Sequence, residues 1–311
     1  MREVSLTDLR LQTARLGGTW SLGQRAKNDV IYVLAMTALA GCRVLPRRAL
    51  GGATRALARV ASVLARGERQ RALSNVRRVL AVDERAATVL VDQCFLSMGD
   101  MLADSIAALF DAPAELSMSA ASHATLHAAI AEGRGVVLPS AHLGPWERVA
   151  FTLVKANVPL VTLVRESYDP RFDRVLSRVR ERAGVRTIPR GSPHAAIHIV
   201  RALRRGLVLG APMDLKSRVS SVRVPFLGVP ADTAVGPARI ALRANVPVVV
   251  ATLEQLPSGA REVTATRLDT SKLDRDDPDA ARALTTQIND ELSRRILTAP
   301  SLWPWMHPRW D

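Results

Sequence analysis

The middle of the chain alternates short apolar runs with helical patterns, and this alternation limits the fold more than any other feature. The β-type runs lie at 135–140, 159–164, 185–189, 207–211, 246–254 and 262–268. Between and around them the sequence predicts helices over 119–132, 145–156, 170–183, 193–205, 236–244 and 278–297. Strands that alternate with helices form a largely parallel sheet covered on both faces. We therefore expect an α/β fold with a largely parallel central sheet flanked by helices.

Residues 136–147, VVLPSAHLGPWE, join one of these strands to the helix that follows it. The apolar start is typical of a buried strand, and Gly144 with Pro145 ends the run, so the strand stops near His142. With Gly144 as the N-cap and Pro145 at the first helical position, Glu147 is expected at the third. In sheets of this kind ligands bind beyond the carboxyl ends of the strands, which is where His142 is expected.

The spacing of His142 and Glu147 has a possible chemical meaning. A carboxylate on one ring nitrogen holds a histidine in one tautomer, and the other nitrogen can then take a proton from a hydroxyl. Such a pair suits acyl transfer to an alcohol. The spacing equally fits a capping box, in which Glu147 only caps the helix and His142 is an ordinary loop residue. Spacing alone leaves both interpretations open.

Four blocks of sequence carry a resemblance to a known family. HLGPWE, within GVVLPSAHLGPWE at 135–147, resembles the His-x4-Asp/Glu motif of the lipid A lauroyl/myristoyl acyltransferases and the related phosphatidylinositol mannoside acyltransferases. NVRRVL at 75–80, VPFLGVPADTAVGPARIAL at 224–242 and WPWMHPRW at 303–310 resemble the same family in the same order. The resemblance implies a glycerolipid-acyltransferase-like fold, with His142 as general base and Glu147 as its partner.

The resemblance also implies residues that bind substrate. Arg165 and Arg180 fall where the family has arginines near the active site. A guanidinium there would bind a phosphate of the acceptor or stabilise an oxyanion, although Arg180 could equally belong to the solvated face of an Arg-rich helix. The block at 224–242 implies a substrate role for Phe226, Gly228, Thr233 and Gly236.

The chain departs from the family just before that block. Many relatives carry a pair of aspartates there, whereas this chain has Met213 and Leu215 at those places, with Asp214 between them. Asp214 is therefore the acidic residue of this segment that we expect to contact substrate.

Charge is concentrated in the N-terminal part of the chain. Of a formal net charge of +14, residues 1–80 carry +11 and the other 231 residues carry +3. A basic field of this kind attracts anionic lipid, nucleic acid or an acidic carrier protein.

The two cysteines indicate no cross-link. Cys42 and Cys94 lie far apart and form no CxxC pair, so the sequence indicates neither a disulfide framework nor a cysteine metal site. This cysteine content favours a reducing, cytoplasmic setting.

Two N-terminal segments are candidates for contact with a membrane. Residues 30–42 are apolar throughout but shorter than the roughly 20 residues of a spanning helix, so they predict either an interfacial or a buried core helix. Residues 47–66 predict an amphipathic helix whose apolar stripe either packs on the domain or lies on anionic lipid. The stripe comprises Leu50, Ala53, Leu57, Val60 and Leu64, opposite Arg48, Arg55, Arg59 and Arg66. We divide the chain into a basic, helical membrane-associating region (1–83) and an α/β acyltransferase domain (84–311).

Other chemistries are disfavoured by their missing motifs. The histidine pairs 123/127 and 194/198 have helical i, i+4 spacing, but no Glu stands between them as in HExxH zinc sites. No GxSxG elbow and no Walker A loop is present, and Ser140 lies too close to His142 in sequence for their side chains to meet. We expect no metal and no cofactor apart from the acyl donor.

These patterns together predict a membrane-associated O-acyltransferase. It would move a fatty acyl chain from a thioester of acyl carrier protein or coenzyme A to a hydroxyl of a glycolipid such as a lipid A precursor. The expected location is the cytoplasmic face of the inner membrane, without nucleic acid as a partner. A phosphatidylinositol mannoside or another phospholipid is the alternative acceptor, and a non-catalytic basic protein that binds anionic lipid is the alternative outside the enzymes.

Overall fold

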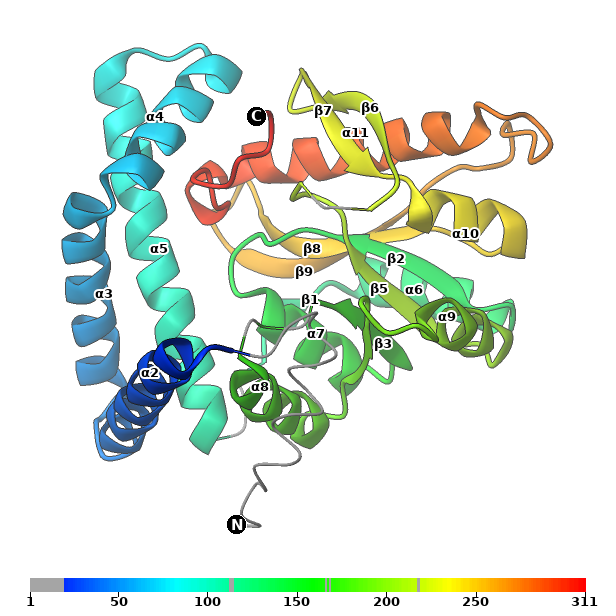
Figure 1. Cartoon of the computed structure of the whole chain (residues 1–311). Coiled ribbons are helices and arrows are strands. Elements are labelled where there is room, and N and C mark those ends of the chain that lie inside the picture. Colours follow the sequence, from blue (N-terminus) through cyan, green and yellow to red (C-terminus); the bar gives the residue numbers. More distant parts are fainter. Residues whose placement is uncertain (1–19, 112–114, 166, 168, 217–218) are drawn as a thin grey trace.

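The computed structural model describes residues 20–311 apart from 112–114, 166, 168, 217 and 218. Four helices gather on one side of the molecule and the sheet with its own helices on the other (Figure 1). The four helices are α2 (Leu22–Cys42), α3 (Arg47–Leu64), α4 (Arg66–Leu80) and α5 (Glu84–Phe110). The last of these, α5, packs against both α3 and α4 and also against the C-terminal segment beside the sheet.

The centre of the sheet is parallel, as expected. Strands β2 (Val136–Ser140), β5 (Val208–Pro212), β3 (Leu160–Val164) and β4 (Arg186–Pro189) pair in this order, all in the same direction. A parallel bridge between Val137 and Val248 joins β2 to β8 (Val249–Gln255). Strand β9 (Arg261–Arg267) pairs antiparallel with β8, and β1 (Ser117–Met118) pairs with β9. The predicted α/β class is therefore confirmed.

The helices around the sheet lie within a few residues of the expected ranges. They are α6 (Ala120–Ala131), α7 (Trp146–Lys155), α8 (Pro170–Arg182), α9 (Ala195–Arg204), α10 (Gly236–Ala244) and α11 (Ala280–Thr298), followed by the 3-10 turn η1 (Pro300–Leu302). In Figure 1, α10 and α11 lie on one side of the sheet and α7 on the other. The apolar stripe of α7, which includes Val149, Phe151 and Leu153, is buried. Burial of that stripe fixes α7, and with it the turn that carries His142.

Two local expectations differ from the structure. Pro145 is the N-cap of α7 and Trp146 its first residue, so Glu147 is the second helical residue and not the third. The block at 224–242 contains a β-hairpin that the sequence analysis missed, formed by β6 (Ser221–Phe226) and β7 (Val229–Ala234). Its two-residue turn has Leu227 at φ 50° and Gly228 at φ 77°, the left-handed backbone that tight hairpins require.

The C-terminal residues fold back into the core and connect the sequence blocks that carry the family resemblance. The side chains of Trp303 and Trp305 are fully buried. The amide Nδ2 of Asn75, in the first block, donates to the carbonyl of Trp305 at 2.9 Å. Arg309 donates from Nη2 to Thr233 Oγ1 at 2.6 Å, which ties the last block to the hairpin block. Blocks far apart in sequence are thus in direct contact.

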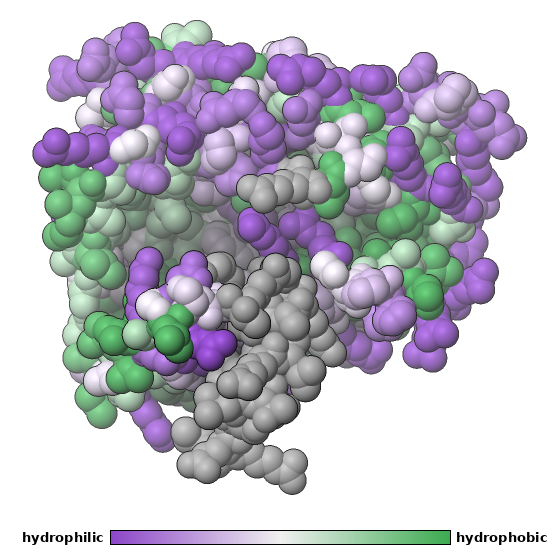
Figure 2. Space-filling view, viewed as in Figure 1, coloured by the Kyte–Doolittle hydropathy of each residue, from purple (hydrophilic) through white to green (hydrophobic). Residues whose placement is uncertain are grey.

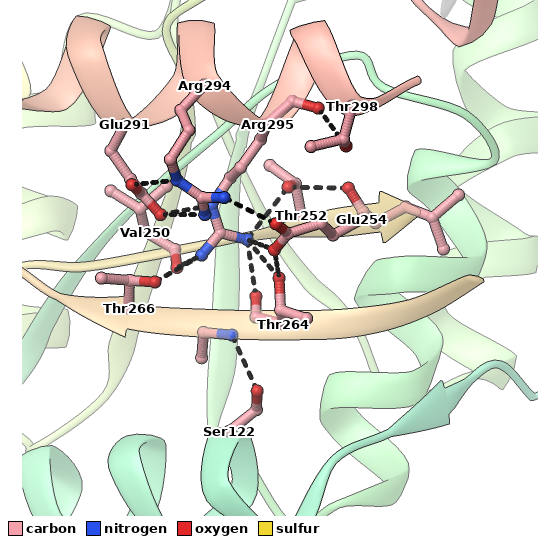
Figure 3. Close-up of polar contacts among 12 residues, drawn as sticks. Ser122, Val250, Thr252, Glu254, Thr264, Thr266, Glu291, Arg294, Arg295 and Thr298 are labelled. Carbon is pink, nitrogen blue, oxygen red and sulfur yellow. Dashed lines mark hydrogen bonds and ion pairs between the residues drawn. The ribbon is translucent and has the colours of Figure 1, made fainter. Parts of the chain in front are cut away.

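A buried arginine fastens α11 to the sheet (Figure 3). The fully buried Arg295 donates to Thr264 Oγ1 at 2.6 Å, Thr266 Oγ1 at 2.8 Å and Glu291 Oε1 at 2.8 Å. Burial would raise the pKa of Glu291, but the guanidinium groups of Arg294 and Arg295 outweigh it and lower that pKa to about 2. Burial still lowers the pKa of Arg295 in spite of these partners, so removal of one partner would leave a buried charge that is costly to keep.

Apart from Leu50, helix α3 turns small residues inward and leaves its large apolar residues exposed. Its buried side chains are Leu50, Thr54, Ala58 and Ser62. Helix α5 approaches this face closely at Gly99, where a Cβ atom would lie 2.8 Å from the carbonyl oxygen of Thr54. By contrast, Leu57, Val60 and Leu64 are 57%, 54% and 74% exposed. The alternative in which the apolar stripe packs on the domain is therefore wrong for these three residues.

Helix α2 presents a second exposed apolar surface. Val30, Ile31, Val33 and Leu34 are all exposed, so residues 30–42 do not form a buried core helix. Figure 2 shows hydrophobic residues along the side of the molecule where α2 and α3 lie. We call the exposed residues Val30, Ile31, Val33, Leu34, Leu57, Val60, Val63 and Leu64 the apolar arm face.

One helix of the described chain, α5, is long and apolar enough to cross a membrane by length and composition. A third of its most apolar window is buried inside the protein, against α3, α4 and η1.

Candidate active site

Two neighbouring parallel strands bring a histidine and a carboxylate together. In the register of β2 with β5, Ser140 is opposite Pro212. His142 and Asp214 each lie two residues further on, so they meet at the same edge of the sheet. His142 Nδ1 lies 3.0 Å from Asp214 Oδ1, and the backbone N–H of His142 donates to Asp214 Oδ2 at 2.9 Å.

Asp214 is enclosed, while His142 is partly open. The Asp214 side chain has no exposed surface, and that of His142 is 28% exposed. A third group reaches the carboxylate from the C-terminal segment, since the indole Nε1 of Trp303 donates to Asp214 Oδ2 at 2.9 Å. The carboxylate therefore accepts three hydrogen bonds that orient it toward the histidine.

The charges of this pair support each other. Burial alone would lower the pKa of His142, but the charge of Asp214 and its hydrogen bond outweigh burial, with a further contribution from Glu147, and the pKa is raised. Burial would raise the pKa of Asp214, yet His142 and the hydrogen bonds to the carboxylate lower it. Asp214 is thus ionised at neutral pH and accepts a hydrogen bond from Nδ1–H of His142. The lone pair of His142 lies on Nε2.

Glu147 has a different partner from the one expected. Its carboxylate forms a two-point ion pair with Arg180 of α8, in which Arg180 Nε donates to Oε2 at 3.1 Å and Nη2 contacts Oε1. The position that we expected Glu147 to occupy, on the far ring nitrogen of His142, is taken by Asp214. Because α7 begins one residue later than expected, Glu147 comes from its second position, and α8 supplies the charge that it meets.

A cavity of about 250 Å³ opens beside His142 between α7 and the strands of the sheet. Its polar end is formed by His142, Trp146, Glu147, Arg165 and Arg180, and its apolar walls include Leu138, Val149, Leu153, Leu160 and Leu163. A second cavity of similar volume, among α5, α7 and α8, shares Trp146, Glu147 and Arg180 with the first. The Glu147–Arg180 ion pair therefore separates two largely apolar cavities.

Two arginines, Arg165 and Arg190, place positive charge near His142. Arg165, directly after β3, lines the cavity beside His142 as the sequence suggested. Arg190, directly after β4, was missed by the sequence analysis. Burial lowers the pKa of Arg190, and the nearby charge of Arg165 lowers it further. The sequence could have predicted Arg190 near the site, because it follows the apolar run at 185–189 and the carboxyl ends of parallel strands lie at one edge of the sheet.

The four residues expected to bind substrate in the block at 224–242 lie elsewhere. None of them lines the cavity beside His142. Phe226 is fully buried beside Trp303, with ring centroids 5.7 Å apart. Thr233 is fully buried and accepts hydrogen bonds from Asn289 and Arg309. Gly228 forms the hairpin turn and Gly236 begins α10.

The missing acidic pair also has a structural explanation. Met213 is buried in the hydrophobic core, and Leu215 packs against that core from a partly buried position. Their apolar side chains therefore serve packing. Asp214 between them was expected to contact substrate, but its side chain is fully enclosed and bonds His142 and Trp303 instead.

The fold and the site together define a class of protein: an α/β protein with a histidine–aspartate pair at the carboxyl edge of a parallel sheet, beside a cavity lined by apolar side chains and two arginines. Residues 24–311 match the model of the bacterial lipid A biosynthesis acyltransferases, and the chain belongs to that family. It is also 27% identical over 189 residues to the phosphatidylinositol mannoside acyltransferase of Mycolicibacterium smegmatis. That alignment spans 60% of this chain and 60% of the relative.

Proposed function

We propose that the protein is a membrane-associated O-acyltransferase that moves a fatty acyl chain from a thioester to a hydroxyl of a glycolipid. The donor is an acyl chain on acyl carrier protein or coenzyme A. The observation that carries the proposal is the His142–Asp214 pair at the edge of an apolar cavity. A general base next to an apolar space is what transfer of a fatty acyl chain to an alcohol requires.

The geometry supports a direct attack on the thioester. His142 Nε2 takes the proton of the acceptor hydroxyl as the oxygen bonds to the thioester carbonyl carbon. The resulting imidazolium is stabilised by Asp214, whose carboxylate receives the Nδ1 proton in a hydrogen bond and stays ionised. The tetrahedral intermediate then collapses, the C–S bond breaks, and the leaving thiolate takes the proton from Nε2.

The cavity supports the assignment of substrate parts. Its apolar walls suit the acyl chain of the donor, whose burial there is favoured by roughly 0.8 kcal/mol per methylene group. Arg165, at the polar end, is the candidate to bind the oxyanion or an acceptor phosphate. Arg180 lines the same cavity, but its charge is already paired with Glu147. We therefore assign Glu147 the role of holding Arg180 in place, together with an electrostatic effect on His142.

The apolar arm face supports a position on a membrane. Large apolar side chains on α2 and α3 are exposed together, and residues 1–80 carry +11 of the net charge of +14. An amphipathic surface with basic residues favours the interface of an anionic lipid bilayer. In this proposal the apolar arm face of α2 and α3 docks on the cytoplasmic leaflet of the inner membrane, where the acceptor lipid is embedded.

The comparisons suggest two candidate acceptors: a lipid A precursor, after the family description, and a phosphatidylinositol mannoside, after the relative from Mycolicibacterium smegmatis. Mass spectrometry of membrane lipids from cells with and without the active protein distinguishes them. The true product carries one acyl chain more than its precursor, and its head group identifies the acceptor.

The decisive test of the mechanism is His142→Ala. Loss of the general base should lower turnover by at least about a hundredfold, with unchanged thermal unfolding. A variant with near-wild-type turnover would reject the mechanism. If the protein were instead a non-catalytic lipid-binding protein, this variant would keep all function, and only loss of residues 1–80 would remove it.

A further inference from the structure

We propose that Trp303 is a positioning residue of the active site, which acts on His142 through Asp214. The inference rests on the proposed function of His142 and adds a third member to the pair. Trp303 lies 89 residues after Asp214 in sequence, in a segment with no chemical role of its own. Its indole N–H is the one side-chain donor, besides His142, that bonds the Asp214 carboxylate within the described chain.

The contact is enclosed and fixed from several sides. Both Trp303 and Asp214 are fully buried, so water does not compete for the hydrogen bond. The carbonyl oxygen of Trp303 accepts from Cys94 Sγ of α5 at 3.1 Å. Its ring packs edge-on against Trp305, with ring centroids 5.0 Å apart, and beside Phe226 at 5.7 Å. The indole therefore has one place to direct its N–H.

The hydrogen bond has two consequences for the histidine. It keeps Asp214 Oδ1 aimed at Nδ1, because Oδ2 is held by the indole and by the backbone N–H of His142. It also draws negative charge toward Oδ2, which limits how strongly the carboxylate raises the pKa of His142. Trp303 thus sets both the direction and the basicity of the general base.

The test compares Trp303→Phe with Trp305→Phe. Each change removes one buried indole N–H, but Trp305 Nε1 donates to the carbonyl oxygen of Pro300 at 2.7 Å and not to Asp214. Trp303→Phe should lower kcat by about ten- to a hundredfold, as expected for loss of a hydrogen bond to a charged group. Trp305→Phe keeps an aromatic ring against Trp303 and leaves the hydrogen bond to Asp214 in place, so it should lower kcat far less. Thermal unfolding of both variants shows whether their stabilities are comparable.

A pH profile separates a positioning role from a purely structural one. Without the indole, more of the carboxylate's charge acts on Nδ1–H. The acid limb of kcat/KM should therefore move to higher pH in Trp303→Phe and stay in place in Trp305→Phe. A loss of activity with an unshifted or lowered limb would overturn the inference, as would equal activity in the two variants. In either case, an inactive His142→Ala would leave the proposed function standing.

A measurement on the intact protein covers the case in which Trp303→Phe does not fold. In protein labelled with 15N-tryptophan, each of the five indole N–H groups gives its own resonance. Substitution of the other four tryptophans, one at a time, assigns their resonances and leaves that of Trp303. The Trp303 resonance should move as His142 titrates and should lose this response in His142→Ala. A Trp303 resonance that ignores the titration of His142 would show that the two groups are not coupled.

Discussion

Helices α3 and α7 are both amphipathic, yet they use their apolar stripes in opposite ways. Helix α7 buries Val149 and Leu153 on the side that faces the sheet, while α3 leaves Leu57 and Leu64 exposed. Instead, α3 packs on α5 through small side chains, where Gly99 allows the two backbones to approach. Periodicity therefore reveals a stripe but not what covers it. Helix α7 thus stabilises the fold around the active site, whereas α3 presents an exposed apolar surface.

The largest expected effect lies on the buried side of this comparison. Asp214→Asn should lower kcat by about three to four orders of magnitude, because an amide can favour the wrong tautomer of His142. Glu147→Gln should lower it far less, since Glu147 bonds Arg180 and not the histidine ring. Steady-state kinetics of the two variants decides between them. A larger loss of kcat in Glu147→Gln than in Asp214→Asn would favour the histidine–glutamate dyad that the sequence suggested.

The two helices should also differ in their contribution to stability. Leu153→Ala in α7 should lower the free energy of unfolding by about 2–5 kcal/mol, because it opens a cavity beside the sheet. Leu57→Ala in α3 should change it by less than about 0.5 kcal/mol, because that side chain is mostly exposed. Chemical denaturation measures both. Equal losses would mean that another surface covers Leu57 in solution.

Exposed leucines of α3, which contribute little to stability, should contribute most to membrane binding. Leu57→Ser together with Leu64→Ser should weaken binding to anionic vesicles by about ten- to a hundredfold, because each leucine loses favourable apolar burial. Vesicle sedimentation measures the effect. The matched control is Ile197→Ser with Leu297→Ser, two residues of the α/β part that are each 50% exposed. Equal weakening by both pairs would refute a docking surface on α2 and α3.

The smallest expected effect is a shift in pH dependence. The net effect of Asp214 raises the pKa of His142, so the acid limb of kcat/KM should lie above the ordinary histidine value of about 6.5. Protonated His142 is no base, and activity should rise with pH through this limb. Asp214→Asn removes the charge that raises the pKa, so NMR titration of His142 should show a lower value in that variant. An unchanged value would mean that Asp214 does not control the histidine.

Local sequence was sufficient for much of the fold. The apolar runs predicted the parallel strands, and the helical patterns predicted the helices between them to within a few residues. The hairpin of β6 and β7 was missed because each strand contains a proline and a charged residue that interrupt an apolar run. Sequence also placed His142 and Arg165 correctly at the carboxyl edge of the sheet.

The sequence by itself determined which elements form and that a histidine would stand where a buried strand ends, because those properties depend on neighbouring residues. Only the tertiary structure decided which carboxylate meets that histidine. Asp214 is 72 residues away, and the register of β2 with β5 brings it to Nδ1, while Glu147, five residues away, turns to Arg180. The same holds for Trp303 and for the outward face of α3, since contacts between distant segments follow from packing and not from spacing along the chain.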